Sequence, residues 1–387
     1  MRVHRLWLTD VRSYASADVE FGEGLTVIVG PNGTGKTNLL EAVGYLATLG
    51  SFRGAPTEAM VRQGASEAVL RAETSHESRQ VLIEAEIAGS SRRGRVLVNK
   101  QALRRTRDLL GVLRVSVFSP DDLALVKGGP SERRQCLDQA LVGLHPRNDA
   151  LVTELDRILR QRNALLRQCG GRLAGDAAIT LDVWDAKLAA TGTALSDARC
   201  ALVGELGPIL ATAYRDIAGA SLKSPLVRAA YVSSWRDHPG GLEAALQEGR
   251  VDDVRRGLSL IGPHRDDLTL TIDGRSTRTH ASQGEQRTVA LALRLGVHRL
   301  LTAALGSAPV LLLDDVFSEL DPMRSEALLA HLPPGQTLLA TAGVVPPSAH
   351  VERTIRVAEG IDGTLLHPSA GDKLGETVDE TALESAK

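Results

Sequence analysis

The order of hydrophobic and polar residues predicts a chain that begins with strands. Short alternating or continuous apolar runs mark six predicted strands in the first hundred residues, at 3–8, 18–21, 25–29, 69–74, 80–87 and 94–98. A helix is predicted to begin at Asn38, directly after a glycine-rich segment. The last strands of this set are expected to form an antiparallel sheet beside a parallel one.

A long charged stretch punctuated by leucines predicts two antiparallel helices in the middle of the chain. The first covers residues 131–168 and the second runs from about residue 179 to residue 216, with Cys169-Gly170-Gly171 as the break between them. Their apolar spacing is compatible with a short coiled coil. Glycines and a proline between residues 192 and 208 interrupt the second helix, however, which favours a compact helical subdomain.

An α/β pattern returns after Leu258, with strands predicted at 268–272, 310–313 and 337–340. The predicted fold class is therefore α/β, a mixed sheet with helices that carries an inserted, mostly helical second lobe. At 387 residues the chain exceeds a typical single domain. We expect an α/β lobe built from residues 1–125 and 258–365, a helical lobe at 126–257, and a disordered acidic tail at 366–387.

Composition narrows the class of protein. Hydrophobic residues make up 43% of the chain and aromatic residues only 3%, which argues against a platform of stacked aromatic rings that binds single strands. No apolar run was found that approaches the ~20 residues needed to cross a bilayer, and the beginning lacks a signal-peptide core. We therefore expect a cytoplasmic protein with no membrane partner. The three widely spaced cysteines indicate reduced thiols.

Charge leaves room for nucleic-acid binding only as a local patch. The net charge is −2, so the overall field does not attract a polyanion. One basic cluster contains no acidic residue and consists of Arg92, Arg93, Arg95, Lys100, Arg104, Arg105 and Arg107. Its arginines are the candidate contacts to DNA phosphates. Alternatively, they solvate a hairpin and pair with nearby acids.

The segment Gly30-Pro31-Asn32-Gly33-Thr34-Gly35-Lys36-Thr37 matches the phosphate-binding loop of P-loop nucleotidases at every fixed position. It follows a buried-strand pattern and precedes a helix, as that loop requires. Glycines let successive backbone N–H groups point at phosphate oxygens, and the helix N-terminus adds a positive dipole. Lys36 is expected to reach the β- and γ-phosphates of ATP, and the Thr37 hydroxyl to bind Mg²⁺. An accidental glycine-rich turn is the alternative.

A second segment, which is acidic, completes the predicted ATP site. The apolar run 310–313 ends in Asp314-Asp315, which places two carboxylates at the carboxyl edge of a parallel sheet. Asp314 is expected to hold Mg²⁺, and Asp315 to orient and activate the attacking water. A strand followed by an ordinary acidic turn is the alternative in isolation.

Ser282 opens a predicted helix that runs to about Leu300. Taken alone, Ser282 and Glu285 form a capping box, but their place before the acidic strand resembles the signature motif of ABC-type ATPases. The resemblance implies that Ser282, Gly284 and Gln286 of one copy contact the γ-phosphate held by another. It also implies that the loop ending at Asp321 crosses the dimer interface.

The same resemblance has two departures. Thr341 stands where many members carry a switch histidine, and Asp315 stands where most relatives have glutamate, so slow turnover is implied.

Three further blocks resemble the RecF recombination-mediator family, which is related to the heads of SMC proteins. They are Val11-Arg12-Ser13-Tyr14, the segment from Pro120 to Asp138, and Gly262-Pro263-His264-Arg265-Asp266-Asp267-Leu268. Cys136 departs from the large aromatic residue usual in that family. With the phosphate loop and the signature, the resemblance covers most of residues 1–365.

This resemblance implies an ATP-dependent DNA-binding protein of recombinational repair and replication. Such a protein dimerises on ATP, hydrolyses it slowly, and engages single-stranded DNA, gaps and junctions between single and double strands. It assists recombinase loading with RecR and RecO as partners. By analogy with SMC-like relatives, Arg12 is expected near the nucleotide, although a surface arginine at a strand end is nearly as compatible with the sequence.

Two other functions are compatible with an ATP site of this kind. The ATP-binding subunit of a membrane transporter would carry a switch histidine and would lack the long helical insertion. A chromosome-organising ATPase of the SMC type would need far longer helical arms.

Overall fold

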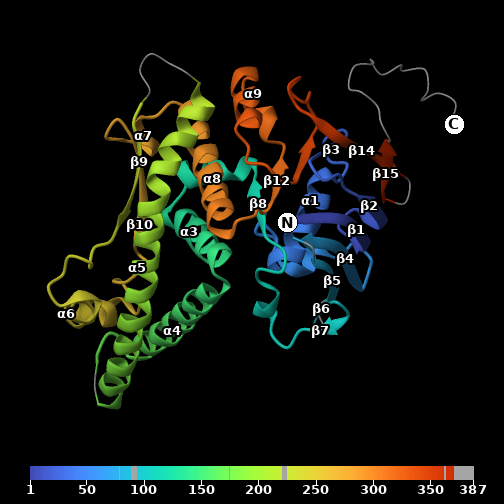
Figure 1. The fold of residues 1–387 in the computed structure, drawn as a ribbon. Helices are drawn as coiled ribbons and strands as arrows, with labels where there is room; N and C mark the ends of the chain where they lie inside the picture. The colour runs from blue at the N-terminus through green and yellow to red at the C-terminus, as the bar shows by residue number, and fades with distance from the viewer. Residues whose placement is uncertain (78, 89–93, 174, 220–224, 361–362, 370–387) are drawn as a thin grey trace.

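The computed structural model describes residues 1–77, 79–88, 94–173, 175–219, 225–360 and 363–369 (Figure 1). Two six-stranded sheets lie at one side of the molecule, and a group of helices with a small sheet lies at the other. This arrangement confirms the predicted α/β class with an inserted helical lobe.

The first sheet is antiparallel, as predicted. Its strands, in spatial order, are β2 (Tyr14–Glu20), β1 (Arg2–Val11), β4 (Glu67–His76), β5 (Arg79–Ala88), β6 (Arg95–Val98) and β7 (Gln101–Ala102). Along β4 buried and exposed residues alternate, so Ala68, Leu70 and Ala72 face inward while Glu67, Arg71 and Glu73 face solvent. The inward face packs on helix α1 (Lys36–Thr48) in a shared apolar core.

The second sheet is parallel except at one edge. Its spatial order is β15 (Gly363–Ser369), β14 (Val351–Gly360), β3 (Leu25–Val29), β13 (Thr337–Thr341), β12 (Val310–Asp314) and β8 (Val115–Phe118). One face shares the core of α1 and the first sheet, through Ile28 and Leu312. The other face, through Val27 and Leu311, packs in the core that contains helix α8 (Gln283–Leu305). The helical and strand layers therefore hold β3 and β12 rigidly.

The sequence prediction missed β8, β14 and β15. β14 alternates charged and apolar residues, and β15 contains the first four residues of the predicted tail, up to Ser369. The remainder of that tail, residues 370–387, lies outside the described residues. The chain thus adds strands to the sheet edge after the last predicted one.

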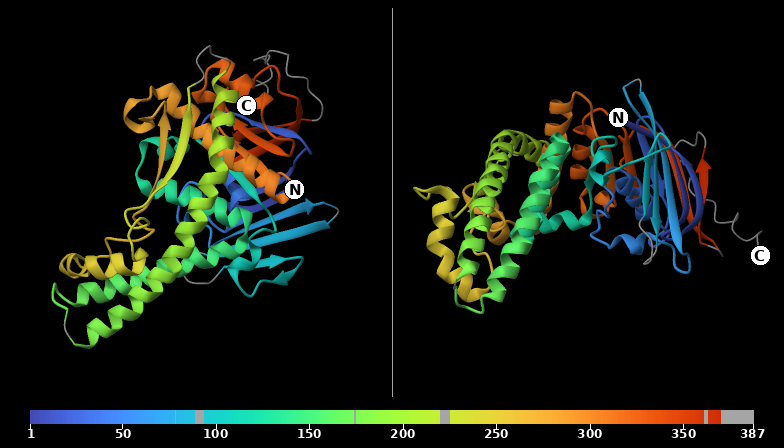
Figure 2. Two further views of the ribbon diagram at one scale, coloured as in Figure 1. Left: turned by 60° about the vertical axis from the view of Figure 1, so that its left-hand side comes forward. Right: turned by 90° about the horizontal axis from the view of Figure 1, so that it is seen from below.

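Three long helices form the arm seen at the lower left of Figure 1 and in both views of Figure 2. They are α4 (Asp149–Gln168), α5 (Asp176–Ala218) and α6 (Gly241–Arg256). The predicted first helix of this region is two helices, because α3 (Pro130–Leu144) ends at His145-Pro146 before α4 begins. The prediction of one continuous helix over 131–168 was therefore wrong.

Helix α5 is continuous over 43 residues, so the predicted interruptions between 192 and 208 do not occur. Pro208 removes the donor to the carbonyl of Gly204, but Gly204 is exposed and has no side chain, so water can reach that carbonyl. Gly192 is a close-packing site, since a Cβ there would lie 2.7 Å from Leu242 Cδ2. Burial of one face of α5 in the core outweighs the weak local helix propensity.

A three-stranded antiparallel sheet completes the helical side, in the order β11 (Arg275–Ser276), β10 (Asp267–Ile272) and β9 (Val227–Val232). The predicted strand at 268–272 is therefore real but belongs to neither large sheet. The division of the chain at residues 125 and 258 stays a prediction.

The block that contains His264 and Asp267 ties this small sheet to α3. Arg133 Nε donates to Asp267 Oδ1 at 2.8 Å, and Arg134 donates to the backbone carbonyl of Asp266 at 2.8 Å. The buried Asp266 carboxylate accepts hydrogen bonds from Tyr231 Oη at 2.7 Å and Trp235 Nε1 at 3.1 Å. These contacts make the block a structural junction of the inserted lobe.

Short elements link these layers. They are α2 (Ala124–Lys127), α7 (Thr277–His280), α9 (Pro322–Ala330), and the 3₁₀ turns η1 (Thr57–Met60), η2 (Thr106–Leu109), η3 (Pro120–Leu123), η4 (Pro146–Asn148) and η5 (Val316–Glu319).

Helix α8 is long and apolar enough to cross a membrane by length and composition, contrary to the sequence expectation that no such run exists. In the structure 67% of its apolar window is buried inside the protein. It lies between the parallel sheet and α5, where a core helix of this composition belongs.

The packing of α8 on β8 predicts a pH-dependent stability. His298 on α8 is 1% exposed, and its Nδ1 lies 2.9 Å from Ser116 Oγ. Desolvation, with a smaller contribution from Arg299, lowers the pKa of His298 to about 4. The unfolded chain binds the proton at higher pH than the native state does. The contribution of neutral His298 to the free energy of unfolding is therefore complete above about pH 6.5 and is lost as the pH falls toward 4.

When the pH is lowered from about 7 to about 5, His298 should reduce the free energy of unfolding by roughly 2 kcal/mol. Urea denaturation of the parent and of His298→Gln at both pH values measures the effect. The variant should lose clearly less stability over this interval, and an equal loss in the two proteins would contradict the assignment.

Candidate functional site

The segment Gly30–Thr37 connects β3 to α1, as expected for a phosphate-binding loop. Gly33 and Gly35 have φ values of 84° and 105°, which side chains rarely adopt. A Cβ on Gly30 would overlap the carbonyl oxygen of Val357 on β14. The loop therefore needs its glycines for backbone conformation and for close packing against a neighbouring strand.

Lys36 begins α1 and lies over this loop. Its Nζ donates to the carbonyl oxygens of Gly30 at 2.8 Å and Pro31 at 2.7 Å, and the residue is only 7% exposed. Desolvation lowers the pKa of Lys36, whereas the negative charges of Asp315 and Asp314 oppose the shift. The loop thus holds a cation at its centre, facing two carboxylates.

Thr37 and Asp314 meet across the sheet although 277 positions separate them in the sequence. Thr37 Oγ1 donates to Asp314 Oδ1 at 2.7 Å. Burial raises the pKa of Asp314, while Thr37, Arg53 and Lys36 stabilise its charged form. This pair brings together the two residues that the sequence assigned to Mg²⁺.

Asp315 follows β12 with a left-handed backbone, φ 47°. Its N–H donates to the carbonyl of Ala340 at 2.8 Å, which fixes the turn against β13. Its Oδ1 is buried, and among the described residues it has no hydrogen-bond partner. Such an unsatisfied buried carboxylate oxygen is costly unless a ligand, ion or water satisfies it.

Thr341, at the end of β13, is fully buried, and its Oγ1 accepts a hydrogen bond from the N–H of Gly343 at 3.0 Å. Its hydroxyl therefore shapes the loop that follows β13.

Arg12 lies in the turn between β1 and β2 and is held by α1. Its Nε and Nη2 donate to the two carboxylate oxygens of buried Glu41, at 2.9 and 2.7 Å. The structure thus gives Arg12 a bidentate ion pair within the chain, and its expected contact with nucleotide stays a prediction.

Sequence reasoning missed three residues around the loop. Ser13 Oγ accepts from Asn38 Nδ2 at 3.0 Å, and Thr364 Oγ1 lies 2.8 Å from Ser13 Oγ and 2.9 Å from the Thr34 carbonyl. Arg53, after α1, is exposed and contributes positive potential at Asp314. Ser13 stands in a family block but was given no role, and no local motif marks Arg53 or Thr364, because the roles of all three depend on tertiary contact.

The proposed signature segment lies at the start of α8. Ser282 caps the helix and forms a capping box, in which its Oγ accepts from the N–H of Glu285 at 3.3 Å. Gln286 is buried and donates to the carbonyls of Thr277 at 3.0 Å and Arg278 at 3.2 Å. Ser282 is exposed, whereas the Gln286 amide is engaged within its own chain.

Asp321 caps α9, since its Oδ1 accepts from the N–H of Arg324 at 2.9 Å. The Arg324 guanidinium lies beside Gly284, where a Cβ would be 2.9 Å from Nη1. The start of α9 therefore contacts the start of α8. Within the described ranges, no group of three or more His, Cys, Asp or Glu side chains forms a metal site.

The residues of the basic cluster do not share one environment in the structure. Arg92 and Arg93 lie outside the described residues. Arg95 stands opposite Glu86 on the neighbouring strand. Arg104, Arg105 and Arg107 are exposed beyond β7, and no ion-pair partner for them occurs in the part of the chain that the structure describes. These last three, together with the exposed Lys100, retain the features of a phosphate-contacting group.

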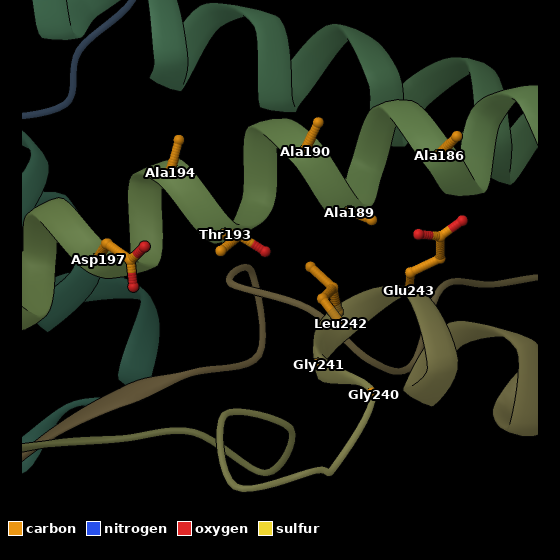
Figure 3. A pocket seen from close by; sticks show the side chains of 10 residues that line it. All are labelled: Ala186, Ala189, Ala190, Thr193, Ala194, Asp197, Gly240, Gly241, Leu242 and Glu243. Carbon is orange, nitrogen blue, oxygen red and sulfur yellow. The ribbon is translucent and has the colours of Figure 1, made fainter.

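An open groove of about 550 Å³ lies in the helical arm, between α5 and the start of α6 (Figure 3). Alanine and glycine dominate its lining, with Asp197 and Glu243 as the only charged residues. Asp197 already pairs with Arg236 at 2.6 Å. The groove shares no residue with the phosphate loop and has no chemistry of its own.

Comparisons with known proteins agree on one family. Residues 2–337 match the family model described as "RecF/RecN/SMC N terminal domain". A Frankia alni protein named "DNA replication and repair protein RecF" is 45% identical over 356 residues, covering 89% of this chain and 94% of the relative. The protein of that name from Kineococcus radiotolerans is 44% identical and covers 92% and 97%.

Solved structures give the same picture. The structure titled "Structure of the recombination mediator protein RecF-ATPrS in RecFOR pathway" has a TM-score of 0.85 and 26% identity, covering 95% of this chain and 98% of the other. The RecF-ATP structure has a TM-score of 0.84 with the same identity, covering 95% and 97%. A Pyrococcus furiosus Smc head domain, at 15% identity, a TM-score of 0.56 and coverage of 95% and 96%, shares the fold alone.

Proposed function

The chain belongs to the RecF family, and from this premise we propose that it is an ATP-dependent DNA-binding protein of recombinational repair and replication. Relatives named for DNA replication and repair cover most of its length. The likeness to the Smc head, at 15% identity, shows the fold alone, whereas the relatives at 44–45% identity are named RecF. We place its action in the cytoplasm.

The observation that carries this proposal is the contact of Thr37 with Asp314 beside the unsatisfied Oδ1 of Asp315. A hydroxyl and a carboxylate 2.7 Å apart are oxygen ligands of the kind that Mg²⁺ prefers. Thr37 and Asp314 would hold that ion, which neutralises phosphate charge when bound. The N–H groups of Gly33–Thr37 and the Lys36 ammonium would bind the β- and γ-phosphates. Asp315 would accept a proton from the attacking water.

ATP would also join two copies of the chain. Ser282 and Gly284 stand at the N-terminus of a 23-residue helix, with Ser282 in solvent, so they can bind a phosphate from outside their own chain. In the dimer each γ-phosphate would contact the loop of one copy and Ser282 of the other. Because only the triphosphate reaches both, ATP favours the closed dimer and hydrolysis reopens it.

DNA contact is assigned to Arg104, Arg105 and Arg107. Exposed arginines without carboxylate partners release counterions when they bind phosphates, which gives affinity without sequence preference. On the outer face of the neighbouring sheet Arg71 is paired with Glu84, and Glu67 and Glu73 are acidic, so we expect DNA to follow the rim of that sheet rather than its face. Gapped or junction DNA as substrate, and RecR and RecO as partners, follow from the family.

The test is DNA binding measured against salt concentration, with ATP, ADP or no nucleotide, on duplex, single-stranded and gapped DNA. ATP should strengthen DNA binding, most on gapped DNA. Replacing the three arginines by alanine should reduce the slope of the logarithm of the binding constant against the logarithm of salt concentration, by the equivalent of up to about three phosphate contacts. Arg71→Ala, which removes an arginine paired with Glu84, is the control. Equal binding in all three nucleotide conditions would overturn the proposal.

Asp315→Asn should separate hydrolysis from binding. The amide cannot take a proton from water, so the steady-state rate of phosphate release should fall about 100-fold. ATP binding and ATP-dependent dimerisation should persist, because the fold of the turn depends on the backbone of Asp315. Asp121→Asn, at an exposed aspartate of η3, is the matched control. Unchanged turnover in the Asp315 variant would remove this residue from the mechanism.

A further inference from the structure

Two large apolar side chains stand in solvent near the proposed ATP site. Val344, in the loop after β13, is 90% exposed, and Met323, in the first turn of α9, is 74% exposed. Among the described residues outside the helical arm, the next most exposed large apolar side chain is Leu365, at 51%. Single exposed apolar residues are common on protein surfaces, so their position must carry the argument.

Both residues stand on segments that connect the two halves of the site. In the sheet β13 runs between β3 and β12, so the loop after β13 lies between the phosphate loop and Asp315. From Asp315 the chain passes through η5 to the start of α9, where Arg324 lies beside Gly284. The strip from the phosphate loop to the signature segment therefore runs through Val344 and Met323.

A side-chain contact ties the two apolar segments together. Ser348, four residues after Val344, donates a hydrogen bond to the carboxylate of Glu326 on α9. Val345, next to Val344, is buried in the core that contains α8. Val344 and Met323 are thus mounted on supported backbone rather than on free ends, as anchors of an interface should be.

Symmetry decides what covers this strip. If two copies share two ATP molecules, the phosphate loop of each faces Ser282 of the other, and the two-fold axis must pass between these two points on each surface. We propose that Val344 and Met323 are the apolar anchors at the centre of the ATP-bound dimer, and that their partner is a second copy of this chain. This inference rests on the proposed ATP-dependent dimerisation.

The small size of the anchors fits a switch. A stable interface buries roughly 800 Å² on each partner, more than two aliphatic side chains supply. Val344 and Met323 therefore add affinity to a dimer that still needs the γ-phosphate. In the monomer both side chains are exposed to solvent, and they become buried only when the second copy binds.

The test is the dimer dissociation constant in the presence of ATP, measured by sedimentation velocity on Val344→Asn. Asparagine is neutral, so it removes the apolar contact without changing the charge beside the phosphates. Dimerisation should weaken at least about tenfold, which corresponds to 1.4 kcal/mol, while ATP affinity measured on dilute monomer stays the same. Met323→Asn should act in the same direction. Val251→Asn is the matched control, because Val251 is 78% exposed on the helical arm and should change nothing.

The outcomes separate the two claims. If the parent dimerises with ATP and Val344→Asn dimerises equally well, the anchors are wrong and the proposed function stands. If the parent stays monomeric with ATP, both fall.

A cross-link gives independent evidence of position. Residues near a two-fold axis meet their own copies, so Val344→Cys, with Cys169 and Cys200 replaced by serine, should form a covalent dimer with a short bismaleimide only when ATP is present. A cross-link yield that ATP does not raise, in a variant that still dimerises, would contradict the central placement.

Discussion

Replacing Lys36 by alanine is expected to weaken ATP binding about 100-fold, or roughly 2.7 kcal/mol, and to abolish ATP-dependent dimerisation. The ammonium is the cation that the loop holds at its centre, beside the carbonyl oxygens of Gly30 and Pro31. A charge-assisted hydrogen bond contributes about 1.5–3 kcal/mol, so the loss of one strong contact to a phosphate already accounts for a reduction of this size. A fluorescent ATP analogue titrated into the purified variant measures it.

The matched control for this variant is Lys187→Ala, which removes an exposed lysine of α5 that lies over the Trp184 ring. It should bind ATP and dimerise as the parent does. A Lys36→Ala protein that dimerises with ATP like the parent would refute the nucleotide switch, whatever its effect on hydrolysis.

Ser282→Arg should also lose dimerisation, but it should keep the ATP binding of the monomer, which Lys36→Ala loses. The residue is exposed, and its side-chain hydrogen bonds are made to Glu285 of its own helix, so its own copy's ATP site should not change. In the partner's site, by contrast, arginine would replace a small hydroxyl at the point where the γ-phosphate must fit. Sedimentation with ATP should show the variant as monomer at concentrations where the parent is dimeric.

Ser282→Ala separates helix capping from this steric effect. Both variants lose the hydrogen bond to the N–H of Glu285, which costs about 1 kcal/mol of helix stability. Thermal unfolding should therefore shift alike in the two, whereas only the arginine variant should lose dimerisation completely. Undiminished ATP-dependent dimers of Ser282→Arg would remove the signature from the account.

The features that the sequence predicted best are those with a contiguous pattern. The phosphate loop, β3 and the strand ending in Asp314 are each defined by adjacent residues, and the structure places all three as expected. The family blocks that contain Arg133 and Asp267 are each contiguous in the sequence, and the structure shows the ion pair that joins them.

The features that the sequence could not predict depend on contacts between distant segments. Nothing local to Arg12 announces its ion pair with Glu41, and nothing near Thr364 places it beside Ser13. Helix α5 continues through Pro208 because one of its faces packs in the core and the other is open to solvent. Helix propensity, which depends on the residue type alone, includes neither effect. Strand β14 was not predicted because few of its residues are apolar, and its place in the sheet depends on its pairing with β3.

The central claim is that the γ-phosphate of ATP joins two copies of this chain. Sedimentation velocity of the parent protein with ATP, with ADP and without nucleotide tests it most directly, each with and without gapped DNA. The account predicts dimer with ATP and monomer in the other two conditions. A sedimentation coefficient that stays monomeric under all conditions, or a dimer that forms equally well with ADP, would contradict it.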